Sequence, residues 1–229
     1  MMDKKILFAV TSNGKKGDTG ESTGYYLSEV AHPWNVLHRA GYDIDFISPK
    51  GGKPPVEAVD LDDPLNAAFW NDEAGRGRVE RSRRPDEIDS DDYAALFFAG
   101  GHGTMWDFPG NPELAKLILA FHGEDKVIAA VCHGPSALAD VKLENGRYLV
   151  EGKRINAFTD DEERAVGMDK IVPFLLESRL IERGARFEKS GLWQPHVAVD
   201  GRLITGQNPQ SATGVGEAML RLLREGASL

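Results

Sequence analysis

The sequence has little of what would mark a membrane, secreted or nucleic-acid-binding protein. It contains one cysteine among 229 residues, so it can form no internal disulfide and no thiolate zinc cluster, which suggests a reducing compartment. No apolar run approaches the ~18 residues of a membrane-spanning helix. Acidic residues outnumber basic ones by 36 to 27, and the formal net charge of −9 argues against a protein that coats nucleic acid. We therefore expect a soluble, cytoplasmic protein without a membrane or nucleic-acid partner.

Two common nucleotide-binding motifs are also missing. No GxGxxG motif follows the first apolar run, and the glycine-rich segment 100–104 lacks the Gly-Lys-Ser/Thr ending of a phosphate-binding loop. Nucleotide cofactors are therefore disfavoured. The composition, with 41% hydrophobic and 28% charged residues, is that of an ordinary globular protein.

Short apolar runs alternate with helical patterns along the chain. Such runs are typical of strands that helices cover on both faces, and four are present: residues 6–10, 44–47, 96–99 and 127–131. Helical patterns occupy residues 24–40 and 112–121, and Asn111 is expected as the N-cap of the second. The alternation predicts an α/β fold with a mostly parallel sheet.

The second half predicts further elements. These are a hairpin or edge element over residues 148–157, a helix over 172–183, a hairpin of 196–199 with 203–205, and a last helix over about 211–224. No internal repeat or low-complexity linker appears. We therefore expect a single domain over residues 1–229, with an insertion at about 51–92.

That insertion contains five arginines within residues 76–84, followed by an acidic run at 86–92. Such a charge run is usually a solvated loop paired with its neighbour, and this is the interpretation we favour. An anion-binding patch is the alternative.

The single cysteine lies between an apolar strand and a Gly-Pro-started helical segment. Cys132 follows the run 127–131, and the small residues Ala130 and Gly134 flank it two positions away, as a nucleophile elbow requires. We expect the N-terminal end of the following helix to favour the thiolate. Free cysteines are more often inert core residues, but this position favours a nucleophile.

Two neighbouring features fit a nucleophile. His133 could be a buried core histidine, but beside the thiol it is better placed as a general base or ion-pair partner, and it would need a carboxylate to orient it. The glycine-rich segment 100–104 follows another apolar run and is suited to presenting backbone N–H groups to an oxyanion.

These segments resemble the ThiJ/PfpI superfamily, which has the class I glutamine amidotransferase-like fold. The resemblance extends over nearly the whole chain and is carried by residues 130–135 (Ala-Val-Cys-His-Gly-Pro), 99–103 (Ala-Gly-Gly-His-Gly) and 206–212 (Gly-Gln-Asn-Pro-Gln-Ser-Ala). More narrowly, residues 11–13, 24–34 and 158–160 resemble the branch of heat-shock-protein-31-type glutathione-independent glyoxalases and stress chaperones. The resemblance implies a flavodoxin-like open sheet, mostly parallel, with helices on both faces.

The resemblance also implies which residues form the catalytic centre. In this branch the cysteine and histidine of the elbow, here Cys132 and His133, are joined by an acid from the segment after the Phe-Thr-Asp motif. Four consecutive acids stand there. Spacing favours Glu163, with Glu162 or Asp161 as alternatives.

Further site residues are implied by the same resemblance. The family places a glutamate from the first crossover near the sulfur, and Glu29 occupies the matching position. Gly101, His102 and Gly103 form the expected oxyanion and substrate-binding loop. The backbone N–H groups of Gly101 and His133 are expected to stabilise the developing oxyanion.

The implied reaction is the conversion of methylglyoxal, or a similar small 2-oxoaldehyde, to lactate through a cysteine hemithioacetal. It needs no glutathione, cofactor or metal. Deglycase-like and stress-chaperone roles, with unfolded proteins as clients, and a homodimer are also implied. A thiol-independent holdase chaperone is the alternative function, and a cysteine peptidase ranks third. Amidotransferase activity is disfavoured because His196-Val197-Ala198 lacks the glutamate of the His-x-Glu pair.

Overall fold

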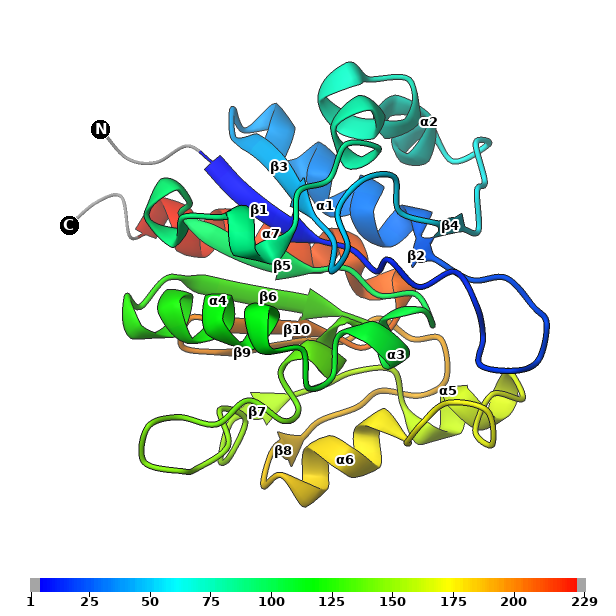
Figure 1. Ribbon diagram of the computed structural model, residues 1–229, viewed down its shortest axis with the longest axis vertical. Helices are drawn as coiled ribbons and strands as arrows, with labels where there is room; N and C mark the ends of the chain where they lie inside the picture. The colour runs from blue at the N-terminus through cyan, green and yellow to red at the C-terminus, as the bar shows by residue number, and fades with distance from the viewer. Residues whose placement is uncertain (1–4, 226–229) are drawn as a thin grey trace.

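The computed structural model describes residues 5–225, in which a six-stranded sheet carries helices on both faces (Figure 1). The strand order is β3-β1-β5-β6-β10-β9. The strands are β1 (Lys5–Ala9), β3 (Asp43–Ile47), β5 (Ala95–Phe98), β6 (Val127–Val131), β9 (Val197–Asp200) and β10 (Leu203–Gly206). All neighbouring pairs are parallel except β9 with β10. The expected flavodoxin-like α/β fold is confirmed.

The apolar runs form parallel strands because each one supplies side chains to two cores. In β1, Leu7 and Ala9 join the core on one face of the sheet, whereas Ile6 and Phe8 join the core on the other. All four expected strands are confirmed within a residue or so of their predicted ends. The predicted hairpin is also confirmed, but its turn is formed by Gly201 and Arg202, one residue later than predicted, because Asp200 still pairs with Leu203.

Two long helices cover one face of the sheet, and a third covers the other (Figure 1). On the first face, α1 (Leu27–Arg39) packs against α7 (Ala212–Glu225). On the second, α4 (Pro112–Gly123) begins at Asn111, whose side chain accepts hydrogen bonds from two backbone N–H groups of the first turn, as predicted. None of the helices within residues 5–225 combines the length and hydrophobicity that crossing a bilayer requires.

The remaining elements are short. The helices are α2 (Pro64–Trp70), α3 (Thr104–Asp107), α5 (Asp160–Ala165) and α6 (Leu176–Glu182), with single turns η1 (Glu73–Gly77), η2 (Pro85–Glu87), η3 (Ser90–Asp92), η4 (Gly134–Ala137) and η5 (Pro209–Ser211). Four two-residue strands form two small parallel sheets: β2 (Tyr25–Tyr26) with β4 (Val56–Glu57), and β7 (Arg154–Ile155) with β8 (Arg186–Phe187).

Three sequence predictions in this part of the chain need correction. Of the hairpin or edge element predicted over 148–157, the hairpin is wrong and only the short strand β7 forms, because β7 pairs in parallel with the distant β8 and the turn residue Gly152 donates to the carbonyl of Gly184. The helix predicted over 172–183 is shorter and spans only Leu176–Glu182; Pro173 disfavours helical conformation at Val172, where the predicted helix would begin. Helix α1 begins three residues later than predicted because Tyr25 and Tyr26 pair with β4.

The segment 51–92 contributes β4, α2 and η1 to η3, and its arginines are bonded within the chain. The pairs are Arg76 with Glu80, Arg78 with Asp43 and Asp45, Arg81 with Glu73, Arg83 with the hydroxyl of Tyr93, and Arg84 with Asp86. These pairs agree with a paired surface loop. Through β4 the same segment reaches the edge of the sheet at which the candidate site lies.

Candidate active site

Cys132 lies directly after β6, at a sharp turn of the backbone. Its N–H donates to the carbonyl of Gly206 at 2.8 Å, and its own carbonyl accepts from the N–H of Phe158 at 2.8 Å. These bonds hold it at φ +59°, in the left-handed region that is unfavourable for any residue except glycine. The turn is the strained strand-to-turn corner of a nucleophile elbow.

A chain of three polar side chains begins at the sulfur. Cys132 Sγ lies 3.3 Å from His133 Nδ1, and His133 Nε2 lies 2.8 Å from Glu163 Oε2. All three residues are buried. Because an ionised carboxylate can only accept, His133 Nε2 carries the donated hydrogen, and in the neutral ring Nδ1 is left free to accept a proton from the thiol.

Only one of the four consecutive acids faces His133. Glu162 is turned toward Thr159, Gln207 and Asn208, each of which donates to its carboxylate. The other two acids bind elsewhere: Asp161 pairs with Arg164 and Lys189, and Asp160 accepts from Ser178. The geometry therefore brings Glu163, rather than Glu162 or Asp161, to the histidine.

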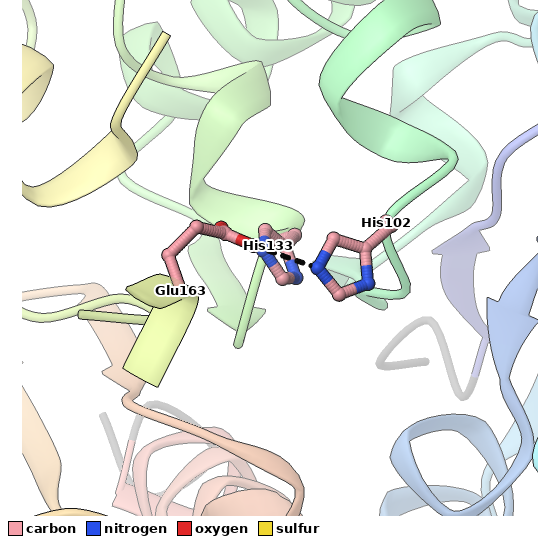
Figure 2. Close-up of side chains that lie close together, drawn as sticks. All are labelled: His102, His133 and Glu163. Atoms are coloured by element: carbon pink, nitrogen blue, oxygen red, sulfur yellow. Dashed lines mark hydrogen bonds and ion pairs between the residues drawn. The ribbon is translucent and has the colours of Figure 1, made fainter. Parts of the chain in front are cut away.

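The second oxygen of Glu163 binds another imidazole. His102 Nε2 lies 2.8 Å from Glu163 Oε1, and the rings of His102 and His133 lie 4.3 Å apart (Figure 2). Burial opposes ionisation of Glu163, but the positive charge of His133 and hydrogen bonds from both histidines outweigh it and lower the pKa of Glu163 to about 2. Burial and the neighbouring His133 lower the pKa of His102. The carboxylate is thus shared by two histidines.

Glu29 belongs to α1 and contacts the thiol of Cys132. Its Oε2 accepts from the backbone N–H of Gly100 at 2.8 Å, while Oε1 has no hydrogen-bond partner within residues 5–225. Burial raises the pKa of Glu29 to about 8, although its contacts with the Cys132 thiol and with Gly100 oppose that shift. The carboxyl group is therefore protonated over most of the neutral range.

The expected stabilisation of the thiolate by a helix is wrong. The residues after Cys132 form only the single turn η4 (Gly134–Ala137), which is too short for a strong helix dipole. Burial, with the negative charge of Glu29 as a second cause, raises the pKa of Cys132 well above its usual value. This raised pKa favours the thiol over the thiolate at neutral pH.

The predicted oxyanion loop divides into parts with different partners. The N–H groups of Gly101 and His133 donate to no group in the described part of the chain, so both are free for an oxyanion. The N–H of His102 instead donates to Glu57 Oε1 at 3.2 Å. Gly103 packs against Thr11 and Asn13, where a Cβ atom would lie 2.5 Å from the carbonyl of Asn13, and it does not line the cleft.

A cleft of about 340 Å³ opens in front of the sulfur. One wall is apolar and consists of Phe158, Val166, Met168 and Trp193. The lining also includes the polar residues Lys16, Tyr26, Glu57 and Gln210. A cleft that combines an apolar wall with a few polar groups suits a small organic molecule.

Several cleft residues were not predicted from the sequence. Trp193 follows no motif, yet it lies in the wall with φ +60° and its side chain is 38% exposed. Tyr26 and Glu57 meet there only because β2 pairs with β4. Pairing between two-residue strands leaves no periodic pattern in the sequence, so no signal was available for these residues.

The chain is similar to proteins named as glyoxalases. It is 35% identical to the glutathione-independent glyoxalase HSP31 of Saccharomyces cerevisiae over 226 residues, which cover 93% of this chain and 94% of the relative. It is 30% identical to Glyoxalase 3 of Candida albicans over 234 residues, which cover 94% of this chain and 97% of the relative.

Solved structures also match this chain over most of its length. The crystal structure of glyoxalase III from Candida albicans matches with a TM-score of 0.85 at 29% identity, covering 95% of this chain and 96% of that one. The Rapid Encystment Protein 24 KDa of Francisella tularensis matches with a TM-score of 0.92 at 37% identity, covering 96% of this chain and 98% of that one.

The family profile described as DJ-1/PfpI matches residues 22–222. The match includes Cys132, Glu29, Glu163 and every strand of the six-stranded sheet except β1. With the relatives above, it confirms the resemblance to the heat-shock-protein-31-type branch. This chain belongs to the DJ-1/PfpI family.

Proposed function

We propose that this chain is a glutathione-independent glyoxalase that converts methylglyoxal, or another small 2-oxoaldehyde, to the 2-hydroxy acid. The observation that carries the proposal is the series of contacts from Cys132 through His133 to Glu163, beside a cleft that Cys132 and His133 line, with the protonated Glu29 close to the sulfur. The relatives named as glyoxalases, which align over more than nine-tenths of the chain, support the same reaction.

In the first step the sulfur of Cys132 adds to the aldehyde carbon. Because the resting group is a thiol, its proton passes to His133 Nδ1, 3.3 Å away, as the carbon–sulfur bond forms. The ionised Glu163 stabilises the resulting imidazolium through Nε2. The aldehyde oxygen becomes an oxyanion that accepts from the N–H groups of Gly101 and His133, and protonation by the imidazolium gives the hemithioacetal.

In the second step a proton moves from the former aldehyde carbon to the adjacent ketone carbon. Glu29 is the group we assign to this transfer. Its pKa of about 8 lies near neutral pH, so both its ionised and protonated forms are accessible. The ionised carboxylate removes the proton to give an enediolate, and the resulting carboxylic acid returns it to the neighbouring carbon. His133, as the second acid–base group, carries the hydroxyl proton from the former aldehyde oxygen to the former ketone oxygen, so that the 2-hydroxyacyl thioester forms.

In the last step water hydrolyses the 2-hydroxyacyl thioester. His133 takes a proton from water, the acyl carbon–sulfur bond breaks, and Cys132 leaves as the thiol. The sum is one 2-oxoaldehyde plus one water to one 2-hydroxy acid, so no oxidant or reductant is consumed. We also place the protein in the cytoplasm, because such a thiol requires a reducing compartment.

The test is the variant Cys132→Ala, assayed for loss of methylglyoxal and formation of lactate. We expect no turnover above the uncatalysed rate, with a melting temperature close to that of the native protein. The variant Ser136→Ala, which changes a nearby buried hydroxyl without a hydrogen-bond partner, should keep its activity. Consumption of methylglyoxal by Cys132→Ala at the native rate would overturn the mechanism.

A thiol-independent holdase is the second candidate. Val59 and Leu61 are 45% and 43% exposed beside the cleft segment at Ala58, and apolar side chains there could hold unfolded clients. A holdase should suppress aggregation of a client equally well with Cys132→Ala. A homodimer belongs to the same proposal, and light scattering after size-exclusion chromatography tests it.

A further inference from the structure

Two histidines and one glutamate converge at the cleft. One ring nitrogen of His102, one ring nitrogen of His133 and a carboxylate oxygen of Glu163 all lie within 4.8 Å of one another. They come from three segments of the chain: the loop before α3, the turn after β6, and α5 (Figure 2). We propose that these three side chains form a binding site for Zn²⁺, and that the ion inhibits the reaction. The inhibition rests on the proposed function, whereas the binding does not.

The donor set matches the chemistry of zinc. Two imidazole nitrogens and one carboxylate oxygen, with an open fourth position, are a common ligand set of Zn²⁺, while Mg²⁺ and Ca²⁺ prefer oxygen ligands alone. Both Nε2 atoms already point at one carboxylate, each at 2.8 Å. The two imidazoles are therefore held at separate oxygens of the same carboxylate before any ion arrives.

The three ligand atoms must adjust their spacing before they can bind one Zn²⁺ ion. Zinc lies ~2.0–2.1 Å from its nitrogen and oxygen ligands, so neighbouring ligand atoms in a tetrahedral site are roughly 3.3 Å apart. Each imidazole–carboxylate contact must lengthen by about 0.5 Å from the observed 2.8 Å, and any ligand atoms as far apart as the 4.8 Å limit must move closer together. The side chain of His102 is 15% exposed and can give way toward the cleft.

Access comes through the cleft. His102 lines the 340 Å³ cleft, so an ion can enter from solvent and keep a water molecule as its fourth ligand. His133 also lines the cleft but is almost fully buried, as is Glu163. His102 is thus the ligand at the entrance, and the other two are fixed by the surrounding structure.

Binding of the ion removes the groups that the reaction needs. To coordinate through Nε2, each neutral histidine must carry its hydrogen on Nδ1. His133 Nδ1 then points a hydrogen at Cys132 Sγ, 3.3 Å away, and can no longer take the thiol proton. The exchange of tautomers needs no net gain or loss of protons, and removal of the ion restores the active arrangement.

The experiment is calorimetric titration of the full chain with ZnCl₂, which measures binding without any turnover. We expect one Zn²⁺ per chain, similar affinity in Cys132→Ala, and a loss of about tenfold or more in His102→Gln. The matched control is His122→Gln, the same change at an exposed histidine of α4, which should bind as the native protein does. MgCl₂ should give no binding heat at the same concentrations.

Two outcomes overturn the proposal. Loss of Zn²⁺ binding in Cys132→Ala would assign the ion to the thiol, and equal affinities for His102→Gln and His122→Gln would remove His102 from the site. A melting temperature that Zn²⁺ raises in Cys132→Ala but not in His102→Gln supports the site even where calorimetry is limited by weak heat. A protein that binds Zn²⁺ through His102 but shows no glyoxalase turnover supports the site and overturns only the proposed function.

Discussion

Glu29 Oε2 accepts a hydrogen bond from the backbone N–H of Gly100 at 2.8 Å, and this bond ties the first helix to the loop after β5. The other oxygen of the carboxyl group has no hydrogen-bond partner among residues 5–225 and lies on the side of the sulfur. Burial raises the pKa of Glu29 to about 8. The fold therefore fixes a neutral carboxylic acid beside a buried thiol, which separates this acid from Glu163, whose pKa is lowered to about 2.

This difference leads to a prediction for Glu29→Gln. The amide keeps the size of the side chain but cannot transfer a proton, so turnover of methylglyoxal should fall by about 10²–10⁴-fold. Alkylation of Cys132 by iodoacetamide should persist, because the sulfur and His133 are unchanged. The control Glu21→Gln alters a largely exposed acid and should keep full activity. Equal turnover in Glu29→Gln and the native protein would remove Glu29 from the chemistry.

The parts of the fold that the sequence could predict are those with a local pattern. Strand β1 places Leu7 in one core and Phe8 in the other, and such a continuous apolar run needs no knowledge of its partners. The failed hairpin at 148–157 is different, because Gly152 bonds to Gly184 far along the chain. No local pattern reports that contact.

The residues of the candidate site could likewise be predicted only where a local sequence pattern marks them. Cys132 could be found because it is the single cysteine and lies between a strand and Gly134, where a Cβ atom would lie 2.3 Å from the carbonyl of Phe98. The choice among the four acids depends on the rotation of α5, in which successive side chains point about 100° apart. Only the packing of α5 settles that Glu163 faces His133 and Glu162 faces Asn208.

A second prediction concerns Glu163 and acid stability. Because its pKa is lowered to about 2 in the folded chain from 4.5, its stabilising contribution is present above pH 4.5 and is lost as the pH falls through about 2. The native protein should therefore have a higher free energy of unfolding than Glu163→Gln at pH 5. This difference should decrease by about 2 kcal/mol when the pH is lowered from 5 to 3. Urea unfolding at both pH values measures it.

The comparison for Glu163 is Asp161→Asn, a change at the exposed acid two residues earlier. It should leave glyoxalase turnover intact, whereas Glu163→Gln should lose most of it, because His133 is no longer held in the required tautomer. A pH-independent difference between the native protein and Glu163→Gln would show that the carboxylate is not the charged partner of His133.

A third prediction concerns Trp193, which lies 5.9 Å from Phe158 between ring centres and forms part of the apolar wall. Trp193→Ala should lower kcat/KM for phenylglyoxal about tenfold more than for methylglyoxal, because only the larger substrate can contact the indole. The control is Leu192→Ala, since Leu192 is 47% exposed and does not line the cleft. An equal loss for both substrates would mean that Trp193 does not contact the substituent.

The last prediction tests the contact between Glu29 and Gly100. A Cβ atom at Gly100 would lie 2.5 Å from Glu29 Oε2 and 2.7 Å from the backbone nitrogen of His133, so Gly100→Ala must push the carboxyl group away from the elbow. Such overpacking should lower the free energy of unfolding by about 1–3 kcal/mol. It should also lower the turnover of methylglyoxal, because the Glu29 carboxyl group is displaced. Gly123→Ala is the control, because a Cβ atom there meets nothing within 4 Å and should leave both quantities nearly unchanged. If Gly100→Ala retained native turnover and native unfolding, the reaction would not depend on the present position of the Glu29 carboxyl group. Glu29 would then lose its assigned role in the proton transfer.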